Sequence, residues 1–269
     1  MLEHPIRQGL TPRCYPDTST AYLAVLTEVL HYPQYECAPR GLKIKEILEV
    51  GFSVLAPADA PIKTLDAERN KVIESYTAKE FALYASGSNS GDDFAAAAKF
   101  WGGLKNPDGT INSAYGKLIF SDKSHGDPNF EVPGYEPGRM NLAGDAVMRT
   151  PWEWAKLCLI NDKDTRQAIF HVNLPDHAWL GTKDYPCTLH GQFFIREGRL
   201  DLSMRMRSND VWRGLVYDMP WFCYLQKRML KELELSILGL RLGIYTHHAA
   251  SMHLYDRDWA AAAKALAAA

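Results

Sequence analysis

Two residues near the middle of the chain, Cys187 and Arg207, have the side chains that nucleophilic chemistry needs. A cysteine thiolate is a reactive nucleophile, and a neighbouring guanidinium stabilises its negative charge. Between them, residues 191–206 read as two strands around the turn 196–199, with period-two alternation on the second strand. Such a hairpin brings Cys187 and Arg207 to the same end of one sheet. Taken alone, the pair also fits a buried structural cysteine and a solvated arginine.

Periodic segments on either side supply the elements that would position this pair. Helices are predicted over 18–30, 66–85 and 92–100, from Thr150 onward, and from Met219 with Pro220 in the first turn. Strands are predicted over 40–55, 168–173 and 239–249. The alanine-rich segment 260–269 favours a helix. Residues 1–39 form an N-terminal extension that is hard to interpret beyond its one helix, and residues 121–143 predict a long surface loop.

Composition sets the broad class. The chain has 269 residues, 46% of them hydrophobic and 23% charged, without a Pro/Gly/Ser-rich linker, so we expect a single domain over 1–269. A net charge of -2 argues against nucleic acid as a partner. Five scattered cysteines without CxxC spacing argue against a metal cluster or a disulfide framework. With neither a signal peptide nor a membrane-spanning apolar run visible, we expect a cytoplasmic protein that binds no membrane.

An ordered set of short motifs resembles the thymidylate synthase superfamily, and within it the deoxycytidylate (dCMP) hydroxymethylase branch is the more similar. The matching residues, in chain order, are Glu80 with Gly87, Trp101, Tyr115-Gly-Lys, Thr165-Arg166, Pro186-Cys187-Thr, Arg207-Ser-Asn-Asp and His253-Leu-Tyr255. The resemblance covers the chain from about Arg40 to Tyr255. It implies an α+β fold in which a large mixed β-sheet is covered by helices, and in which two sheets pack back to back in a homodimer.

The resemblance also implies chemistry at C5 of a pyrimidine nucleotide. Cys187 would add to ring C6 and make C5 nucleophilic toward 5,10-methylenetetrahydrofolate, the co-substrate that supplies one carbon. No metal is implied. Glu80 would organise water and proton transfer, although a helical glutamate is often simply solvated. Trp101 and Tyr115 would border the folate and the reacting centre, and Asp210 would lie near the pterin; without the other motifs, the two aromatic residues are more typical of a core.

By the same resemblance, three arginines would hold the 5′-phosphate of the nucleotide. Arg207 would act with Ser208, and Arg166 would reach across from the other subunit, because guanidinium matches phosphate geometry. The family usually has a second arginine where this chain has Gln167, so that contact is missing or is supplied elsewhere, with Arg40 as the candidate. Arg166 alone also fits a charge near a helix C-terminus.

The sugar and the rest of the nucleotide would be bound by residues near the end of the matched region. His253 and Tyr255 would hydrogen-bond the 3′-hydroxyl, and Asn209 belongs to the nucleotide-binding segment that begins at Arg207. Ser208 beside Arg207 favours a deoxyribose.

Two features distinguish the hydroxymethylase branch from the thymidylate synthases: Asp218 and the segment that follows Tyr255. Thymidylate synthases have Asn at the position of Asp218, whereas a carboxylate accepts from the amino group of cytosine and, when it shares a proton, engages N3. We therefore expect a cytosine mononucleotide, although Asp218 also fits a helix cap. Only fourteen residues follow Tyr255, where the synthases have a segment that excludes water. We expect water to add, giving 5-hydroxymethyl-dCMP.

Other activities stay open at the level of sequence. They are a CMP hydroxymethylase of nucleoside-antibiotic biosynthesis, a methylating synthase of the same fold acting on dUMP or dCMP, and a non-catalytic nucleotide-binding relative. Thr188 follows Cys187 where His is common in thymidylate synthases, which favours the hydroxymethylases.

Overall fold

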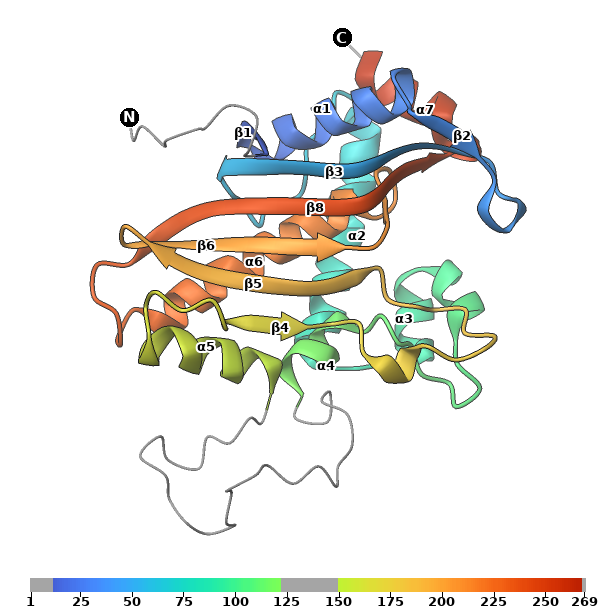
Figure 1. The fold of residues 1–269 in the computed structure, drawn as a ribbon. Helices are drawn as coiled ribbons and strands as arrows, with labels where there is room; N and C mark the ends of the chain where they lie inside the picture. The colour runs from blue at the N-terminus through green and yellow to red at the C-terminus, as the bar shows by residue number, and fades with distance from the viewer. Residues whose placement is uncertain (1–11, 122–149, 268–269) are drawn as a thin grey trace.

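A computed structural model describes residues 12–121 and 150–267, and all structural statements concern these ranges. A mixed sheet runs through the protein (Figure 1) in the order β1-β3-β8-β6-β5-β4, with β2 pairing to β3 and β7 to β8. The strands are β1 (Arg13–Asp17), β2 (Tyr35–Cys37), β3 (Ile44–Ala56), β4 (Ile169–His171), β5 (Thr188–Arg196), β6 (Arg199–Met206), β7 (Asn209–Asp210) and β8 (Arg241–Tyr255). The sheet mixes parallel and antiparallel pairs with no regular βαβ repeat, as expected for an α+β fold.

Helices cover this sheet. They are α1 (Thr18–His31), α2 (Ala67–Ser86), α3 (Gly91–Ala97), α4 (Tyr115–Phe120), α5 (Pro151–Asn161), α6 (Leu215–Leu233) and α7 (Trp259–Ala267), with short 3-10 turns η1 (Pro39–Gly41), η2 (Lys99–Leu104), η4 (Pro175–His177) and η5 (Asp256–Asp258). Helix α6 packs on β6 and β8, α1 on β3, and α5 on β4 and β5, while α2 packs on α6 (Figure 1). Within the described ranges, no helix combines the length and apolar character needed to cross a membrane.

The core lies between the sheet and α6. On β6 the predicted period of two is confirmed, because alternate side chains are buried: Leu200, Leu202, Met204 and Met206. Helix α6 contributes to the same cluster a set of fully or nearly fully buried side chains: Trp221, Phe222, Leu225 and Met229. The burial of this apolar surface is what holds the helix on the sheet.

The hairpin between β5 and β6 turns where the sequence predicts. Glu197 and Gly198 both have left-handed backbones, with φ of 50° and 69°. Two consecutive left-handed residues form a turn whose twist matches that of the flanking strands. The hairpin register, from Arg196 opposite Arg199 to Thr188 opposite Met206, is therefore set locally.

Several predicted helix boundaries are confirmed. The Asp66 carboxylate accepts the backbone N–H groups of Glu68 and Arg69 at the start of α2, and Gly87 ends that helix with φ of 69°. Thr150 caps α5 in the same way. Residues 13–37 contribute β1, α1 and β2, and the predicted loop beyond Ser121 lies outside the described residues.

The start of α6 differs from the prediction. The helix begins at Leu215, one turn before Met219, so Pro220 lies in the second turn instead of the first. Proline lacks the N–H that would donate to the carbonyl of Val216, and one missing bond near a helix start is tolerated. As a result, Asp218 lies inside the helix and does not cap it.

Gly116 allows α4 to lie directly against α2. A Cβ at this position would overlap the backbone carbonyl of Tyr84. Because the two helices come so close, Tyr115 stacks on the ring of Tyr84, with ring centroids 5.5 Å apart. Glycine is therefore required where two site-bearing helices meet.

We predict that Gly116→Ala lowers the free energy of unfolding by about 1–3 kcal/mol, because the added methyl forces α4 away from α2. The matched control is Gly103→Ala, where a Cβ meets no atom within 4 Å. Urea denaturation of both variants measures the effect. Equal midpoints for the two would contradict the close approach of the helices.

Candidate active site

Cys187 and Arg207 lie side by side at one end of the β5–β6 hairpin. Cys187 directly precedes β5, Arg207 directly follows β6, and the Arg207 backbone N–H donates to the Cys187 carbonyl at 2.8 Å. The prediction that Cys187 and Arg207 lie at the same end of one sheet is confirmed. It follows from the hairpin register alone.

The Arg207 guanidinium also holds the segment that leads into Cys187. Its Nε donates to the Pro186 carbonyl at 3.1 Å and its Nη2 to the Tyr185 carbonyl at 2.5 Å. The guanidinium carbon lies 5.1 Å from the centre of the Tyr185 ring. Arg207 thus fixes the backbone around the thiol in addition to placing a charge near it.

Asp184 ties the same segment to the residues that lead into α4. Its buried carboxylate accepts from the backbone N–H of Ser113 at 2.7 Å and from the Ser113 hydroxyl. The Asn112 amide donates to the Asp184 carbonyl at 2.8 Å. Because Ser113 lies two residues before Tyr115, these bonds fix Tyr115 relative to Cys187.

The thiol of Cys187 is not ionised by its surroundings. Burial raises its pKa above the ordinary value, and the charges of Asp218 and Asp184 raise it further. Arg207 and, more weakly, Arg40 lower it. The expected stabilisation of the thiolate by Arg207 is present, but burial outweighs it, because transfer out of water disfavours the charged form.

Glu80 occupies the buried face of α2. The hydroxyls of Tyr76 and Tyr84 donate to its Oε1 at 3.2 and 3.3 Å. The Trp101 indole N–H in turn donates to the Tyr76 hydroxyl at 2.9 Å. Burial, with a contribution from the charge of Asp218, raises the pKa of Glu80 to about 8, and the two tyrosine bonds oppose that shift.

Asp218 lies on α6 with its carboxylate directed at Asn209. The Asn209 Nδ2 donates to Asp218 Oδ2 at 2.9 Å. Burial raises the pKa of Asp218 to about 7, against the lowering effect of this hydrogen bond. A carboxyl group in this state is a proton donor and acceptor at neutral pH.

These residues form one cluster, although they come from four parts of the chain. Tyr115, at the start of α4, has its pKa raised first by burial and then by the charges of Asp218 and Cys187. The charge of Asp218 acts in the same way on Glu80 and on Cys187. We call Cys187, Glu80, Asp218 and Tyr115 the central cluster. Within the described ranges, no group of three or more His, Cys, Asp or Glu could hold a metal ion.

A short loop, residues 211–214, connects β7 to α6 beside this cluster. The Asp210 carboxylate accepts the backbone N–H groups of Trp212 and Arg213 at 2.8 and 3.1 Å. The Val211 N–H donates to the carbonyl of His253 on β8. Burial raises the pKa of Asp210 and lowers that of His253, and each partly offsets the shift of the other.

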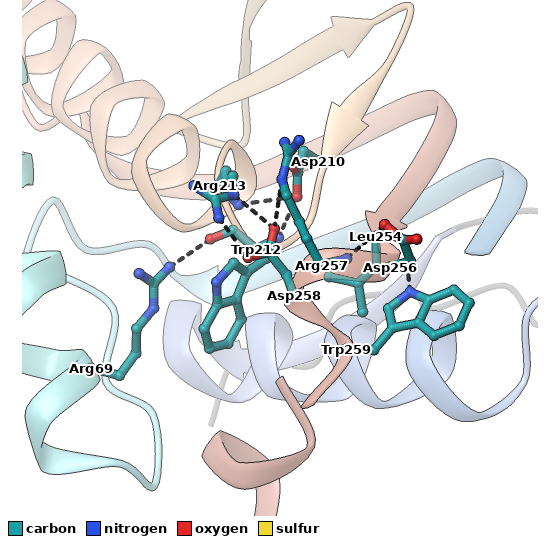
Figure 2. A network of polar contacts seen from close by, with 9 residues as sticks. All are labelled: Arg69, Asp210, Trp212, Arg213, Leu254, Asp256, Arg257, Asp258 and Trp259. Carbon is teal, nitrogen blue, oxygen red and sulfur yellow. Dashed lines mark hydrogen bonds and ion pairs between the residues drawn. The ribbon is translucent and has the colours of Figure 1, made fainter. Parts of the chain in front are cut away.

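Side chains of α2 and η5 form polar contacts with this loop (Figure 2). Arg213 forms a two-pronged ion pair with the buried Asp258 of η5, with N–O distances of 2.7 and 2.6 Å. Arg69 of α2 donates to the Trp212 carbonyl at 2.6 Å, and its guanidinium stacks 4.1 Å above the Trp212 ring. These two sets of contacts by charged side chains therefore fix the loop that leads into α6.

Among the residues predicted to bind the nucleotide, three lie together at the end of β8, whereas Arg40 lies on η1. Ser208 Oγ lies 3.4 Å from His253 Nδ1, and the rings of His253 and Tyr255 meet edge to face at 5.2 Å. These three lie together at one end of β8. Arg40 is exposed in η1 with φ of 55°, near enough to Cys187 for its charge to lower the pKa of the thiol.

Arg166 lies apart from the central cluster of its own chain. It is exposed, and its carbonyl accepts from Gln192 Nε2 at 2.7 Å. Gln192 is five residues from Cys187 along the chain, or roughly 16 Å of strand. A role for Arg166 at a phosphate beside Arg207 thus depends on a second subunit, as the resemblance implies.

Three residues of the site were not predicted from the sequence. Tyr76 and Tyr84 lie one helical turn before and after Glu80, and this spacing on a predicted helix is the signal that finds them. Asp184 gives no local signal, because its partner Ser113 lies in a distant segment.

A sequence model of thymidylate synthases matches residues 20–268. The chain therefore belongs to the thymidylate synthase family. The fold agrees: thermostable thymidylate synthase A from Bacillus subtilis superposes with a TM-score of 0.63 at 17% identity, over 93% of this chain and 84% of that one. The predicted superfamily and its α+β fold are confirmed, whereas the homodimer stays a prediction.

Relatives include both hydroxymethyltransferases and thymidylate synthases. A deoxyuridylate hydroxymethyltransferase of Bacillus phage SP01 is 29% identical over 89% of this chain and 57% of the relative. A deoxycytidylate 5-hydroxymethyltransferase of Enterobacteria phage T4 is 26% identical over 69% of each chain. Thymidylate synthase of Bacillus licheniformis is 25% identical over 58% of this chain and 48% of the relative. The match to the SP01 relative thus spans little more than half of that protein.

We predict that Arg207→Gln slows alkylation of Cys187 by iodoacetamide severalfold at pH 8, because loss of the cation raises the pKa of the thiol. The rate is followed by mass spectrometry of the peptide that contains Cys187, since Cys14 and Cys37 are also accessible. The pH dependence separates the two functions of Arg207. A raised midpoint indicates the lost charge, whereas an unchanged midpoint with an altered plateau would contradict the electrostatic role.

Proposed function

We propose that this protein transfers a one-carbon unit from 5,10-methylenetetrahydrofolate to C5 of dCMP, and that addition of water gives 5-hydroxymethyl-dCMP. The observation that carries the proposal is the central cluster, in which the charge of the buried Asp218, with a pKa of about 7, raises the pKa of both Glu80 and Cys187. Family membership supports the reaction class. The similarity to phage hydroxymethyltransferases supports the use of water in the last step.

Cys187 is the proposed nucleophile. The thiolate adds to C6 of the ring, and the electron pair of the C5=C6 bond makes C5 the atom that attacks the one-carbon donor. Loss of the C5 proton and of tetrahydrofolate leaves an exocyclic methylene, to which water adds as the thiolate leaves C6. Because burial keeps the free thiol protonated, Arg207 is needed to stabilise the thiolate when it forms.

Glu80 is the proposed proton carrier. Its pKa of about 8 lets the carboxyl group take up and release a proton near neutral pH. Its position near Asp218 suits it to proton transfer at the ring. Trp101, Tyr115 and Asp210 are the proposed contacts of the folate.

Asp218 is the residue proposed to recognise the base. Cytosine presents an amino donor at C4 and an acceptor at N3, so its partner must both accept and donate. A carboxyl group with a pKa of about 7 does both when it carries its proton. Asn209 donates to Oδ2 and so fixes the orientation of the group that meets the base.

Phosphate and sugar binding complete the proposal. Nη1 of Arg207 makes no hydrogen bond to any residue in the described part of the chain and would take a phosphate oxygen, with Ser208, Arg40 and Arg166 of a second subunit. His253 and Tyr255 would bind the 3′-hydroxyl. This arrangement requires a homodimer.

A second candidate is hydroxymethylation of dUMP. The dUMP hydroxymethyltransferase of phage SP01 is similar over 89% of this chain. A protonated Asp218 can also donate to O4 of uracil and accept from its N3–H. A direct comparison of substrates separates the two.

We predict that incubation with methylenetetrahydrofolate and dCMP adds one CH2O unit to the nucleotide, measured by product mass, with CMP and dUMP run in parallel. Cys187→Ala should abolish turnover and still bind nucleotide. A gain of CH2 with dihydrofolate formed would indicate a methylating synthase. Product from dUMP alone would favour the second candidate, and no product from any nucleotide would overturn both.

We predict that Asp218→Asn moves preference from dCMP toward dUMP by at least tenfold in the ratio of kcat/KM values. The amide oxygen would face Asn209, which leaves the amide nitrogen, a donor, where the carboxylate accepted. Competition between the two nucleotides in one reaction measures the ratio. An unchanged ratio would contradict the base-reading role.

A further inference from the structure

Three residues of α2 with oxygen-bearing side chains share one face of the helix. Tyr76, Glu80 and Tyr84 are spaced by four residues, so their side chains stack along the helix toward α6 and α4. Both tyrosine hydroxyls donate to the same oxygen, Oε1 of Glu80. None of the described residues hydrogen-bonds to the other oxygen, Oε2.

The direction of one of these bonds is fixed from outside the helix. The indole N–H of Trp101 is only a donor, so the Tyr76 oxygen must accept from it. The single proton of Tyr76 is then available for Glu80. The chain Trp101 to Tyr76 to Glu80 therefore runs in one direction, and its last member receives hydrogen bonds on one oxygen only.

Other groups around Glu80 act against its ionised form or are neutral. Burial of Glu80 and the like charge of Asp218 on α6 both raise the pKa of Glu80. Tyr217 of α6 packs edge to face on Tyr76 at 4.7 Å, and Tyr115 of α4 stacks on Tyr84. Raised pKa values keep all four tyrosines uncharged at neutral pH, so Tyr76 and Tyr84 are the donors that favour the carboxylate.

We propose that Tyr76, oriented by Trp101, and Tyr84 are positioning residues that occupy Oε1 of Glu80 and leave Oε2 as the atom that exchanges a proton at the reacting centre. This inference rests on the proposed function in its use of Glu80 as the proton carrier. It adds residues outside the motifs that carry the family resemblance. Without the two hydroxyls, either oxygen of Glu80 could carry the proton, and the pKa of Glu80 would rise further above neutrality.

The test compares Tyr76→Phe and Tyr84→Phe with Tyr224→Phe. Tyr224 belongs to the same aromatic group, through contacts with Phe81 and Trp221, and has no contact with Glu80 among those in the described chain. All three changes remove one hydroxyl and keep the ring. Only the first two remove a donor from Glu80.

Two measurements are made on each variant across pH 5 to 10. The first is release of tritium from C5 of dCMP and of dUMP, which reports proton removal whichever product forms. The second is infrared difference titration of the protonated carboxyl band, assigned by its loss in Glu80→Gln, which needs no turnover.

We predict that Tyr76→Phe and Tyr84→Phe each move the infrared midpoint and the acid limb of tritium release upward by about 1 pH unit, because one hydrogen bond to the charged form is lost. The sign follows from the role of Glu80 as a base, which acts only when it is ionised. Tyr224→Phe should leave both midpoints unchanged.

Different failures distinguish this inference from the proposed function. A midpoint that moves in the infrared titration without tritium release from either nucleotide would overturn the proposed function and keep the tyrosine contacts. Tritium release that falls equally at every pH, with an unmoved infrared midpoint, would overturn the positioning role and keep the proposed function.

Discussion

Strand β8 determines the arrangement of the molecule, because its backbone pairs along both edges. It runs antiparallel to β3 on one side, from Ile44 opposite Tyr255 to Val54 opposite Tyr245. On the other side it runs parallel to β6 and, further along, to β7, where Asp210 lies opposite His253. Hydrogen bonds between main chains thus carry Ser208, Asp210 and His253 to one place.

Local features of the sequence predicted the elements that carry this framework. Apolar alternation around the turn at Gly198 predicted the hairpin, and with it the neighbourhood of Cys187 and Arg207. A capping aspartate and a terminal glycine set both ends of α2. These features could be predicted because each depends on residues close together in the sequence.

Contacts between distant segments could not be predicted in the same way. Glu80 meets Asp218 only because α2 packs on α6, and no pattern in either helix specifies the other. The net effect on the Cys187 thiol depended on burial, which the sequence does not measure, so the influence of Arg207 was overestimated. The earlier start of α6 follows from its packing on the sheet, which outweighs the local preference of Pro220. Resemblance to the family supplied the grouping that periodicity did not.

The two buried carboxyl groups also make folding a reaction that takes up protons. In an unfolded chain Glu and Asp titrate near pH 4, whereas in the folded protein the pKa of Glu80 is about 8 and that of Asp218 about 7. Between these limits the native state holds protons that the unfolded chain has released. Their contribution to stability is therefore fully present below about pH 4 and is lost as the pH rises through 7 to 8. The linkage makes mildly alkaline solution the condition in which these groups weaken the native state.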